Sequence, residues 1–227
     1  MLLDNIKEKL IETSSIARRI YGLKLLLSLG LNDESKWFLL NKEELKYNIK
    51  FKDDGLVLDF GGYIGEFTSK LSKLNPNMSF LIFEPVPNFY NKCLKRFNKK
   101  QNISVLPYGV TSDGRNIDLA IDGPRTRTSQ SGENQIFATK SITEILDNLD
   151  QVELMKMNIE GLEYECLLSI IHSGSIKKIN YLLIQFHNFR FEDENNYTEI
   201  TRLISKNFNR IFSYKWKWEL WQIKNLQ

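Results

Sequence analysis

The stretch Leu56-Val57-Leu58-Asp59-Phe60-Gly61-Gly62-Tyr63-Ile64-Gly65 decides the fold of this chain. It begins with a short continuous apolar run, which is typical of a strand buried on both faces of a sheet. The glycines that follow permit a tight turn in which a ligand can touch the backbone directly. A helix is expected after Gly65. The stretch therefore predicts a strand, a ligand-binding turn and a helix of an α/β domain.

The same alternation of strand and helix continues along the chain. Further strands are expected at 80–83, 103–106, 154–157, 181–186, 210–214 and 216–222, most of them separated by helical patterns. Repeated β-α-β units imply a Rossmann-like, doubly wound and mainly parallel sheet with helices on both faces. The polar segment 111–139 predicts a hairpin and a loop. Ser141-Ile142-Thr143-Glu144 has the residue types of a capping box that opens a helix.

The first part of the chain differs from the rest. Ile16, Ile20, Leu23 and Leu27 recur at helical spacing and Gly30 is a helix stop, so residues 1–50 are expected to form a helical extension ahead of a domain at 51–227. The apolar face of this extension predicts either a cap packed on the sheet or a lid or dimer surface. The oligomeric state stays open, with a homodimer as one alternative.

Composition sets limits on location and partners. The 227 residues carry a net charge of +3 from lysines that look scattered along the chain, which favours neither a nucleic acid nor a membrane as partner. Cys93 and Cys166 sit in apolar helical patterns, which predicts two buried, reduced thiols. The charged N-terminal segment is unlike a signal peptide, and no apolar run would span a bilayer. We expect a soluble, cytoplasmic protein.

Asp59 points to the kind of ligand at the glycine-rich turn. In a nicotinamide-dependent enzyme this turn faces a pyrophosphate, which a carboxylate two residues before the first glycine would repel. S-adenosylmethionine would instead present a sulfonium and an ammonium group, which Asp59 would attract. The GxGxxG spacing of dinucleotide-binding proteins is also absent. Electrostatics therefore favours S-adenosylmethionine over NAD.

Glu84 ends the second predicted strand. A carboxylate at this place can accept hydrogen bonds from both hydroxyls of a ribose. Pro85 restricts Glu84 to an extended conformation. The alternative is that Glu84 is an ordinary acidic residue before a turn, with no role in binding a ligand. Glu84 therefore predicts a nucleoside ligand without deciding which one.

Four segments in register carry a family resemblance: VLDFGGYIGEFT, FEPVP, SITEILD and LMKMNIEGLEYECL. Together they resemble the FkbM-type family of class I methyltransferases, over roughly residues 54–222. The resemblance implies methyl transfer from S-adenosylmethionine, usually to a hydroxyl of a sugar, glycan or natural product. It also implies a seven-stranded sheet whose last strand is antiparallel.

The resemblance also implies roles for individual residues. The methionine part of the cofactor would be lined by Asp59, Gly61, Gly62, Tyr63 and Gly65. Glu84 would hold the ribose, and Val86 and Gly109 are candidates for the adenine pocket.

Two positions depart from the family pattern. The chain has Asn158 and Gln185 where the family commonly has acids, so the proton acceptor must be found elsewhere. His187 is expected at the mouth of the site, on the same face as Gln185 if the strand is regular, and its imidazole titrates near neutral pH. We take His187 as the candidate base, Glu160 as the second candidate and Asn158 as a group that orients the acceptor.

Two further groups of side chains have open interpretations. Arg125 and Arg127 lie in the polar loop and form either a solvated basic surface or a clamp for an anionic acceptor. Trp216, Trp218 and Trp221 either pack the last strands or stack on a sugar.

Two other functions are compatible with the expected fold, and the residues after the fourth strand of the main sheet bear on both. A nucleic-acid methyltransferase would share the fold, but Asn158-Ile159-Glu160-Gly161 offers no aromatic platform for a flipped base. A non-catalytic nucleoside-binding module of the same fold remains an alternative, because the two amides fit lost chemistry. No cluster with metal-ligand spacing is seen. We expect a small-molecule or glycan acceptor, no nucleic acid, no membrane and no metal.

Overall fold

The computed structural model describes residues 30–122, 125–128 and 134–224. The chain divides into two compact units, Met1–Glu43 and Glu44–Gln227. The described part of the first unit contains helix α3 (Asp33–Leu39), whose first turn is capped by Asn32 through a 2.9 Å hydrogen bond from the Ser35 amide. The helical pattern predicted at Ile16–Leu27 lies outside the described residues.

The second unit is built on a seven-stranded sheet with the order β11-β12-β10-β9-β1-β2-β3. Strand β12 runs antiparallel to both of its neighbours, while the pairs from β10 to β3 are parallel. The Rossmann-like sheet with an antiparallel last strand is therefore confirmed. The strands are β1 (Leu56–Phe60), β2 (Ser79–Phe83), β3 (Ile103–Leu106), β9 (Val152–Met157), β10 (Ile179–Ile184), β11 (Phe208–Tyr214) and β12 (Trp218–Ile223).

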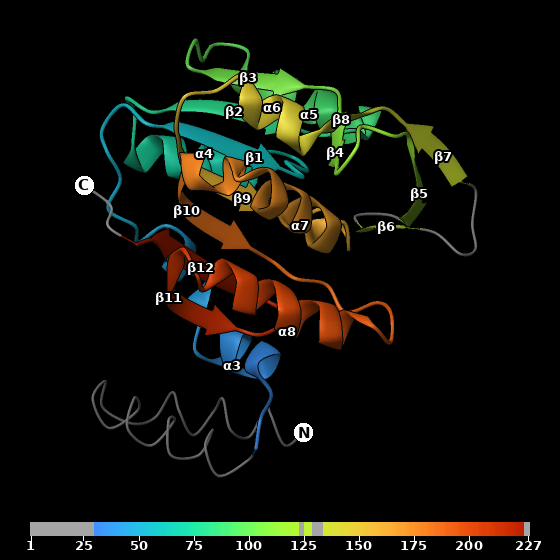
Figure 1. Cartoon of the computed structure of the whole chain (residues 1–227). Helices are drawn as coiled ribbons and strands as arrows, with labels where there is room; N and C mark the ends of the chain where they lie inside the picture. Colours follow the sequence, from blue (N-terminus) through green and yellow to red (C-terminus); the bar gives the residue numbers. More distant parts are fainter. Residues whose placement is uncertain (1–29, 123–124, 129–133, 225–227) are drawn as a thin grey trace, which may run out of the picture. The chain divides into compact units, whose positions relative to one another are not determined.

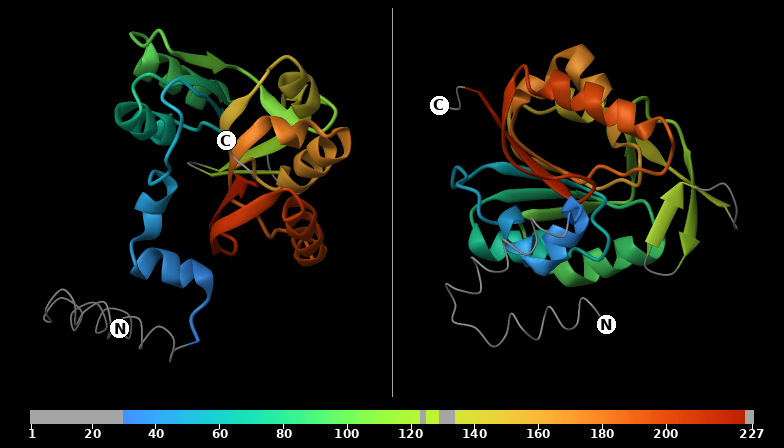
Figure 2. Two further views of the ribbon diagram at one scale, coloured as in Figure 1. Left: turned by 60° about the vertical axis from the view of Figure 1, so that its left-hand side comes forward. Right: turned by 90° about the horizontal axis from the view of Figure 1, so that it is seen from below.

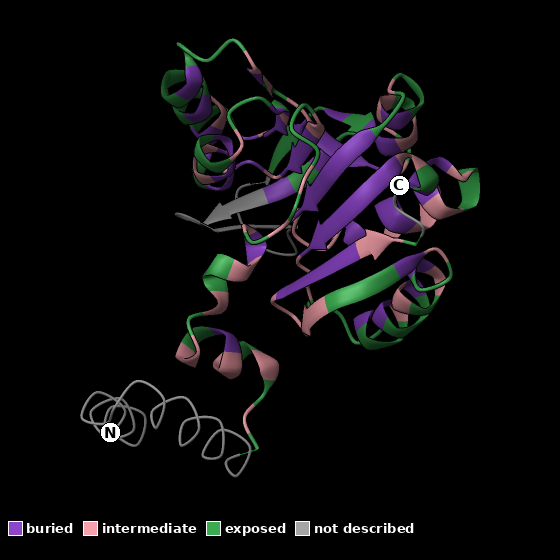
Figure 3. Cartoon of the chain, turned by 90° about the vertical axis from the view of Figure 1, so that its left-hand side faces the viewer, coloured by how far each residue is buried: buried purple, intermediate pink, exposed green. Residues whose placement is uncertain are grey.

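The central strands form the core because they are covered on both faces. Every residue of β9 and β10 is buried, including Lys156 and Asn180. Figure 3 shows these strands in the buried colour, whereas the edge strand β11 is a mixture of exposed and half-buried residues after its buried first residue. Continuous apolar runs such as Leu182-Leu183-Ile184 are what a strand between two helical layers requires.

Helices cover the sheet in two layers (Figure 2). One layer holds α4 (Glu66–Leu74) and α5 (Pro87–Phe97), and the other holds α6 (Ile142–Asp147), α7 (Glu163–Ser173) and α8 (Asp193–Ile204). Short 3-10 turns, η1 (Lys42–Lys46) and η2 (Ser175–Lys178), complete the helical elements of the described chain. None of the helices within the described residues is long and apolar enough to cross a membrane.

An insertion between β3 and α6 forms two small sheets. Strand β4 (Gly109–Thr111) pairs with β8 (Thr139–Ser141), and β5 (Ile117–Asp122) pairs antiparallel with both β6 (Arg125–Thr128) and β7 (Asn134–Phe137). The segment predicted as a hairpin and a loop therefore contains an antiparallel three-stranded sheet with β5 in its centre. Figure 1 shows the β6-β5-β7 sheet standing at the carboxyl-terminal edge of the main sheet.

The start of α6 is predicted correctly, but its capping box does not form. Ser141 occupies the N-cap, yet its side chain makes no capping hydrogen bond. Its Oγ instead donates to the Ser112 carbonyl at 3.1 Å and lies 2.8 Å from Thr143 Oγ1. The β4–β8 pairing brings Ser112 beside Ser141, and this tertiary contact replaces the local one.

The tryptophans near the end of the chain and the two cysteines lie in or beside packed regions of the fold. Trp218 and Trp221 are buried, and Trp221 belongs to the main core cluster, which supports the packing role for these two. Trp216 is partly buried, with its ring centroid 5.1 Å from that of Tyr197. Cys93 and Cys166 are free and buried, as expected.

Candidate functional site

A cavity of about 230 Å³ lies where β1, β2 and β9 end. This is the edge at which open α/β sheets bind ligands, because the turns that follow neighbouring parallel strands meet there. The sequence-predicted residues that line it are Gly61, Tyr63, Glu84, Val86, Gly109, Asn158 and Glu160. Segments nearly 100 residues apart in the chain are thereby brought to one place.

The first glycine is required by a close approach of two backbones. Gly61 has a φ of 77°, and a Cβ at this position would come within 1.9 Å of the Asn158 carbonyl oxygen. The amides of Gly61 and Gly62 both donate to the Phe83 carbonyl, at 3.0 and 3.1 Å. The turn after β1 is thus clamped between the ends of β2 and β9.

Gly62 and Gly65 do not line the cavity. A Cβ on Gly62 would lie 2.2 Å from Cγ2 of Ile82, and one on Gly65 would lie 2.6 Å from the ring of Phe97. Both glycines are needed for close packing: Gly62 allows the turn to pack against β2, and Gly65 allows the start of α4 to pack against α5. Their predicted place beside a ligand is therefore not seen, although they shape the turn that carries Gly61 and Tyr63.

Glu84 is a buried carboxylate at the cavity wall. Its Oε2 accepts a hydrogen bond from the Tyr63 amide at 2.7 Å, and its Oε1 accepts one from the Val86 amide at 3.0 Å. Burial raises the pKa of Glu84 to about 7, and these two amides oppose the rise only in part. The carboxylate is therefore held rigidly but remains short of compensating charge.

Asp59 lies elsewhere than the sequence predicts. It is fully buried, with Oδ1 2.9 Å from Nζ of Lys156 and Oδ2 accepting from Oγ1 of Thr68 at 2.7 Å. The Lys156 ammonium also donates to the Gly61 carbonyl at 2.7 Å. The charge of Asp59 is thus balanced inside the protein, so it fixes the turn and does not face a cationic ligand. The electrostatic argument from Asp59 fails for this reason.

Asn158 carries an unsatisfied polar atom at the cavity. The backbone N–H of Asn158 donates to the Phe60 carbonyl at 3.1 Å, which fixes the position of Asn158 at the end of β9. Within the described residues its buried Oδ1 has no hydrogen-bond partner. A buried acceptor without a donor costs about 1–3 kcal/mol. Such an atom in a cavity wall marks a place where a ligand can donate a hydrogen bond.

The loop after β9 is held by Glu163, which the sequence analysis missed. Glu160 and Gly161 have φ values of 57° and 97°. Glu163 is fully buried at the start of α7 and accepts from the Ile159 amide at 2.8 Å and the Gly161 amide at 2.9 Å. An acidic residue in the first turn of a helix was the available signal.

His187 contacts two carboxylates. Its Nδ1 is 2.8 Å from Oε1 of Glu163, and its Nε2 is 3.6 Å from Oε2 of Glu160. Strand β10 ends at Ile184, so strand alternation does not govern where His187 points. His187 does not itself line the cavity, but Glu160, which faces its Nε2, does.

The pKa of His187 reflects this arrangement. The side chain is only 11% exposed, and this burial lowers the imidazole pKa. Glu163 and Glu160 outweigh burial and raise the pKa of His187 above its usual value. The ring also lies 4.9 Å from that of Phe189. A histidine oriented through Nδ1 by a carboxylate keeps Nε2 available for proton transfer.

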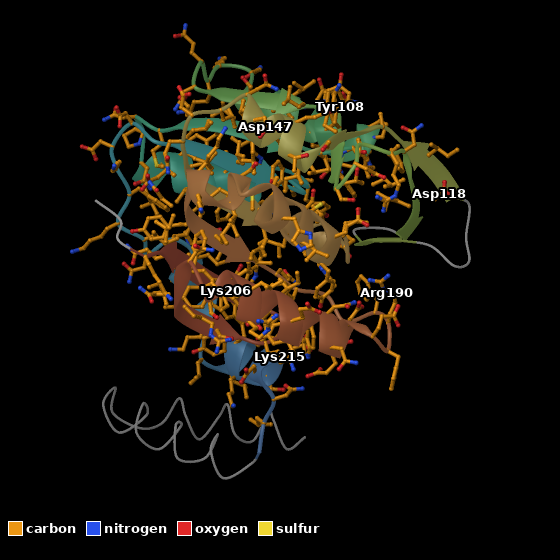
Figure 4. The ribbon with its side chains drawn as sticks, viewed as in Figure 1. Tyr108, Asp118, Asp147, Arg190, Lys206 and Lys215 are labelled. Atoms are coloured by element: carbon orange, nitrogen blue, oxygen red, sulfur yellow. The ribbon has the colours of Figure 1, made fainter. Side chains whose placement is uncertain are left out.

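The small sheet adds an apolar wall to the cavity. Ile117 and Leu119 of β5 line it together with Val86 and Phe89. The backbone of Arg125 and Arg127 forms β6, next to β5, but their side chains lie outside what the structure describes. Arg190, in the loop after β10, also lies at this edge of the molecule (Figure 4).

Comparison with known proteins agrees with this architecture. The family model described as "Methyltransferase FkbM domain" matches residues 59–212, which is more than half of the chain. A curated relative, the tRNA (guanine-N(7)-)-methyltransferase of Mycoplasmopsis agalactiae, is 27% identical over 179 residues, covering 72% of this chain and 85% of the relative.

Two solved structures share the fold. The methyltransferase FkbM of Methylobacillus flagellatus superposes with a TM-score of 0.55 at 20% identity, over 77% of this chain. This chain spans only 45% of the length of that protein. A fibrillarin/Nop5p complex matches with a TM-score of 0.50 at 11% identity, over 79% of this chain and 76% of that one.

The family match covers the glycine-rich turn, Glu84, the loop after β9 and His187. It confirms the resemblance seen in the sequence motifs. The chain belongs to the FkbM methyltransferase domain family.

Proposed function

We propose that this protein uses S-adenosylmethionine to methylate a hydroxyl group of a sugar, a glycan precursor or another small acceptor. The observation that carries the proposal is the placement of Glu84 in one cavity with Gly61 and Tyr63 of the glycine-rich turn. A buried carboxylate beside an open glycine-rich turn suits a nucleoside whose ribose donates hydrogen bonds.

The residues present fit such a cofactor. Each oxygen of Glu84 accepts one backbone amide, which leaves each oxygen capacity for a further donor such as a hydroxyl. Val86, Phe89 and Ile117 supply an apolar surface for a base, and Asn158 Oδ1 offers an unused acceptor. When bound, S-adenosylmethionine supplies a methyl group already activated by its sulfonium.

The protein's remaining task is to orient the acceptor and remove its proton. We assign proton removal to Nε2 of His187, with Glu163 holding Nδ1 and so fixing the tautomer. Glu160 lines the cavity, has its carboxylate 3.6 Å from this imidazole and is the second candidate for the base. Asn158 orients the acceptor.

Calorimetry with S-adenosylmethionine, its demethylated product and NAD tests the cofactor assignment. We expect the first two to bind and NAD not to bind. Incubation with labelled S-adenosylmethionine and a panel of nucleotide-linked and phosphorylated sugars then tests transfer. Tight NAD binding would refute the cofactor assignment, whereas product binding without transfer to any acceptor would favour a non-catalytic nucleoside-binding module.

A second candidate acceptor is the N7 atom of guanine in tRNA, after the name of the curated relative. Guanine N7 has a free lone pair and loses no proton on methylation, whereas a hydroxyl must be deprotonated. The two candidates therefore differ in their need for His187. A His187→Asn variant should keep most of its activity on tRNA but lose activity on a hydroxyl acceptor.

A further inference from the structure

A run of positive charge without acids lies on α5 and in the turn after it. Residues 85–112 contain no Asp or Glu, but they contain Lys92, Lys95, Arg96, Lys99 and Lys100. Removing these five from the chain's 31 Lys and Arg leaves 26 against 28 Asp and Glu. These five cations exceed the chain's net charge of +3, and they lie together in α5 and the turn after it.

Helix α5 presents these charges to solvent. Its apolar residues Phe89, Cys93 and Phe97 are buried, while all five cationic residues are exposed. Lys92, Lys95 and Lys99 are spaced by three and four residues, so they follow one face of the helix and continue into the turn. Among the described residues, none of the five cations is in a salt bridge.

In a second acid-free segment, salt bridges compensate part of the positive charge. Residues 200–218 also hold five Lys and Arg and no acid. There acids that flank the segment pair with two of the cations: Arg210 with Glu219 at 3.9 Å, and Lys215 with Glu194. The fold offers α5 no such partners within the described chain. The charge of α5 is therefore available to a partner.

The shape of the surface selects the kind of partner. Side chains on a convex helix diverge, so five cations cannot converge on one small anion. An anionic membrane would need apolar side chains to insert, and the exposed face of α5 offers Leu94, which is 40% exposed. An extended chain of phosphates can contact the cations one after another.

We infer that the exposed face of α5 and the turn after it, which carry Lys92, Lys95, Arg96, Lys99 and Lys100, bind the phosphate backbone of RNA. This replaces the expectation that no nucleic acid is bound. Phe89 on the buried side of the helix lines the cavity, so RNA lying along α5 would pass beside the site. The inference does not depend on the proposed cofactor or reaction.

Fluorescence anisotropy with a labelled single-stranded RNA of about 20 nucleotides tests this surface. With five phosphate contacts, the logarithm of the binding constant should fall with the logarithm of salt concentration with a slope of about −3.5. In a Lys95→Glu/Lys99→Glu/Lys100→Glu variant the slope should become shallower by about 2. The variant keeps Lys92, the cation nearest along the chain to Phe89 of the cavity, and should still bind the demethylated cofactor product.

A matched control carries the same change in charge elsewhere. The Lys177→Glu/Arg202→Glu/Lys206→Glu variant alters three exposed cations outside α5, with Lys206 just beyond the end of α8 (Figure 4). It should keep the wild-type slope. Equal loss in both variants, no binding of RNA by the wild-type protein, or binding to phosphatidylglycerol vesicles in place of RNA would overturn the inference. Cofactor binding is measured separately, so its failure would bear on the proposed function alone.

Discussion

Oε1 of Glu163 and Nδ1 of His187 lie 2.8 Å apart, and this contact joins the start of α7 to the segment after β10. The same carboxylate holds the amides of Ile159 and Gly161. One buried side chain thus fixes both the candidate base and the loop that carries Glu160. The orientation of His187 and the shape of that loop are therefore coupled.

Glu163→Gln should lower the pKa of His187, because the raised pKa depends on this carboxylate. The chain has only two histidines, so the His187 imidazole can be followed by NMR once a His172→Gln variant assigns the other signal. The acidic limb of the pH–rate profile should move to lower pH. Glu165→Gln on the same helix is the control, since Glu165 pairs with Arg115. An unchanged titration of His187 in Glu163→Gln would contradict this prediction.

His187→Asn should reduce kcat on a hydroxyl acceptor by roughly 10²–10⁴-fold, the usual contribution of a general base. Affinity for the cofactor should hardly change, because His187 does not line the cavity. Activity of the wild-type enzyme should rise with pH as His187 loses its proton, and this limb should vanish in the variant. A variant with full kcat and the same acidic limb would shift the role to Glu160, and Glu160→Gln would be the next measurement.

Cofactor affinity should depend on pH through Glu84. Its pKa is about 7 without ligand, and hydroxyl donors favour the charged carboxylate. Binding of the demethylated product should therefore be tightest above pH 7 and weaken by up to about tenfold per unit as the pH falls below 7. Calorimetry between about pH 5.5 and 8.5 measures this, with proton release on binding in the neutral range.

The Glu84 variants provide the comparison for that titration. Glu84→Gln should give an affinity that no longer changes with pH in this range. Glu84→Ala should lose charge-assisted hydrogen bonds worth roughly 1.5–3 kcal/mol, or about ten- to a hundredfold in affinity. Wild-type affinity in Glu84→Ala would show that Glu84 does not hold the ligand.

Breaking the buried pair of Asp59 and Lys156 should destabilise the domain. Asp59→Asn or Lys156→Met alone leaves one buried charge without its partner and should lower the free energy of unfolding by about 3–5 kcal/mol. The double variant should recover part of this loss. Urea denaturation measures each value, with Lys36→Met, which removes the half-buried ion pair with Asp33, as a control expected to cost less than about 1 kcal/mol. Single variants as stable as this control would refute the assigned role.

Arg125→Ala/Arg127→Ala should raise the KM for an anionic acceptor and leave cofactor affinity unchanged. The reason is the expected clamp by two cations on β6, beside the strand that contributes Ile117 and Leu119 to the cavity. Steady-state kinetics on a phosphorylated and a neutral acceptor separate charge from general damage. Equal KM values in variant and wild type on the phosphorylated acceptor would exclude the clamp.

Sequence alone determined the local elements and their order. Continuous apolar runs identified β1, β2 and β9, because a strand buried on both faces can contain little else. Gly61 and Glu84 were found because a tight turn and a strand end have characteristic residues at fixed spacing. The topology followed, since repeated β-α-β units leave few alternatives.

Tertiary structure alone decided how charges and polar groups are paired. Lys156 lies 97 positions after Asp59, and no local pattern tells that the two meet, so Asp59 was misassigned to the ligand. Glu163 was missed because its partners come from a loop with positive φ values and from the segment after β10. The acid-free segments at α5 and at 200–218 look alike in sequence, but the fold supplies acids only to the second within the described residues. Local elements depend on neighbours in sequence, whereas pairing of buried charges depends on neighbours in space.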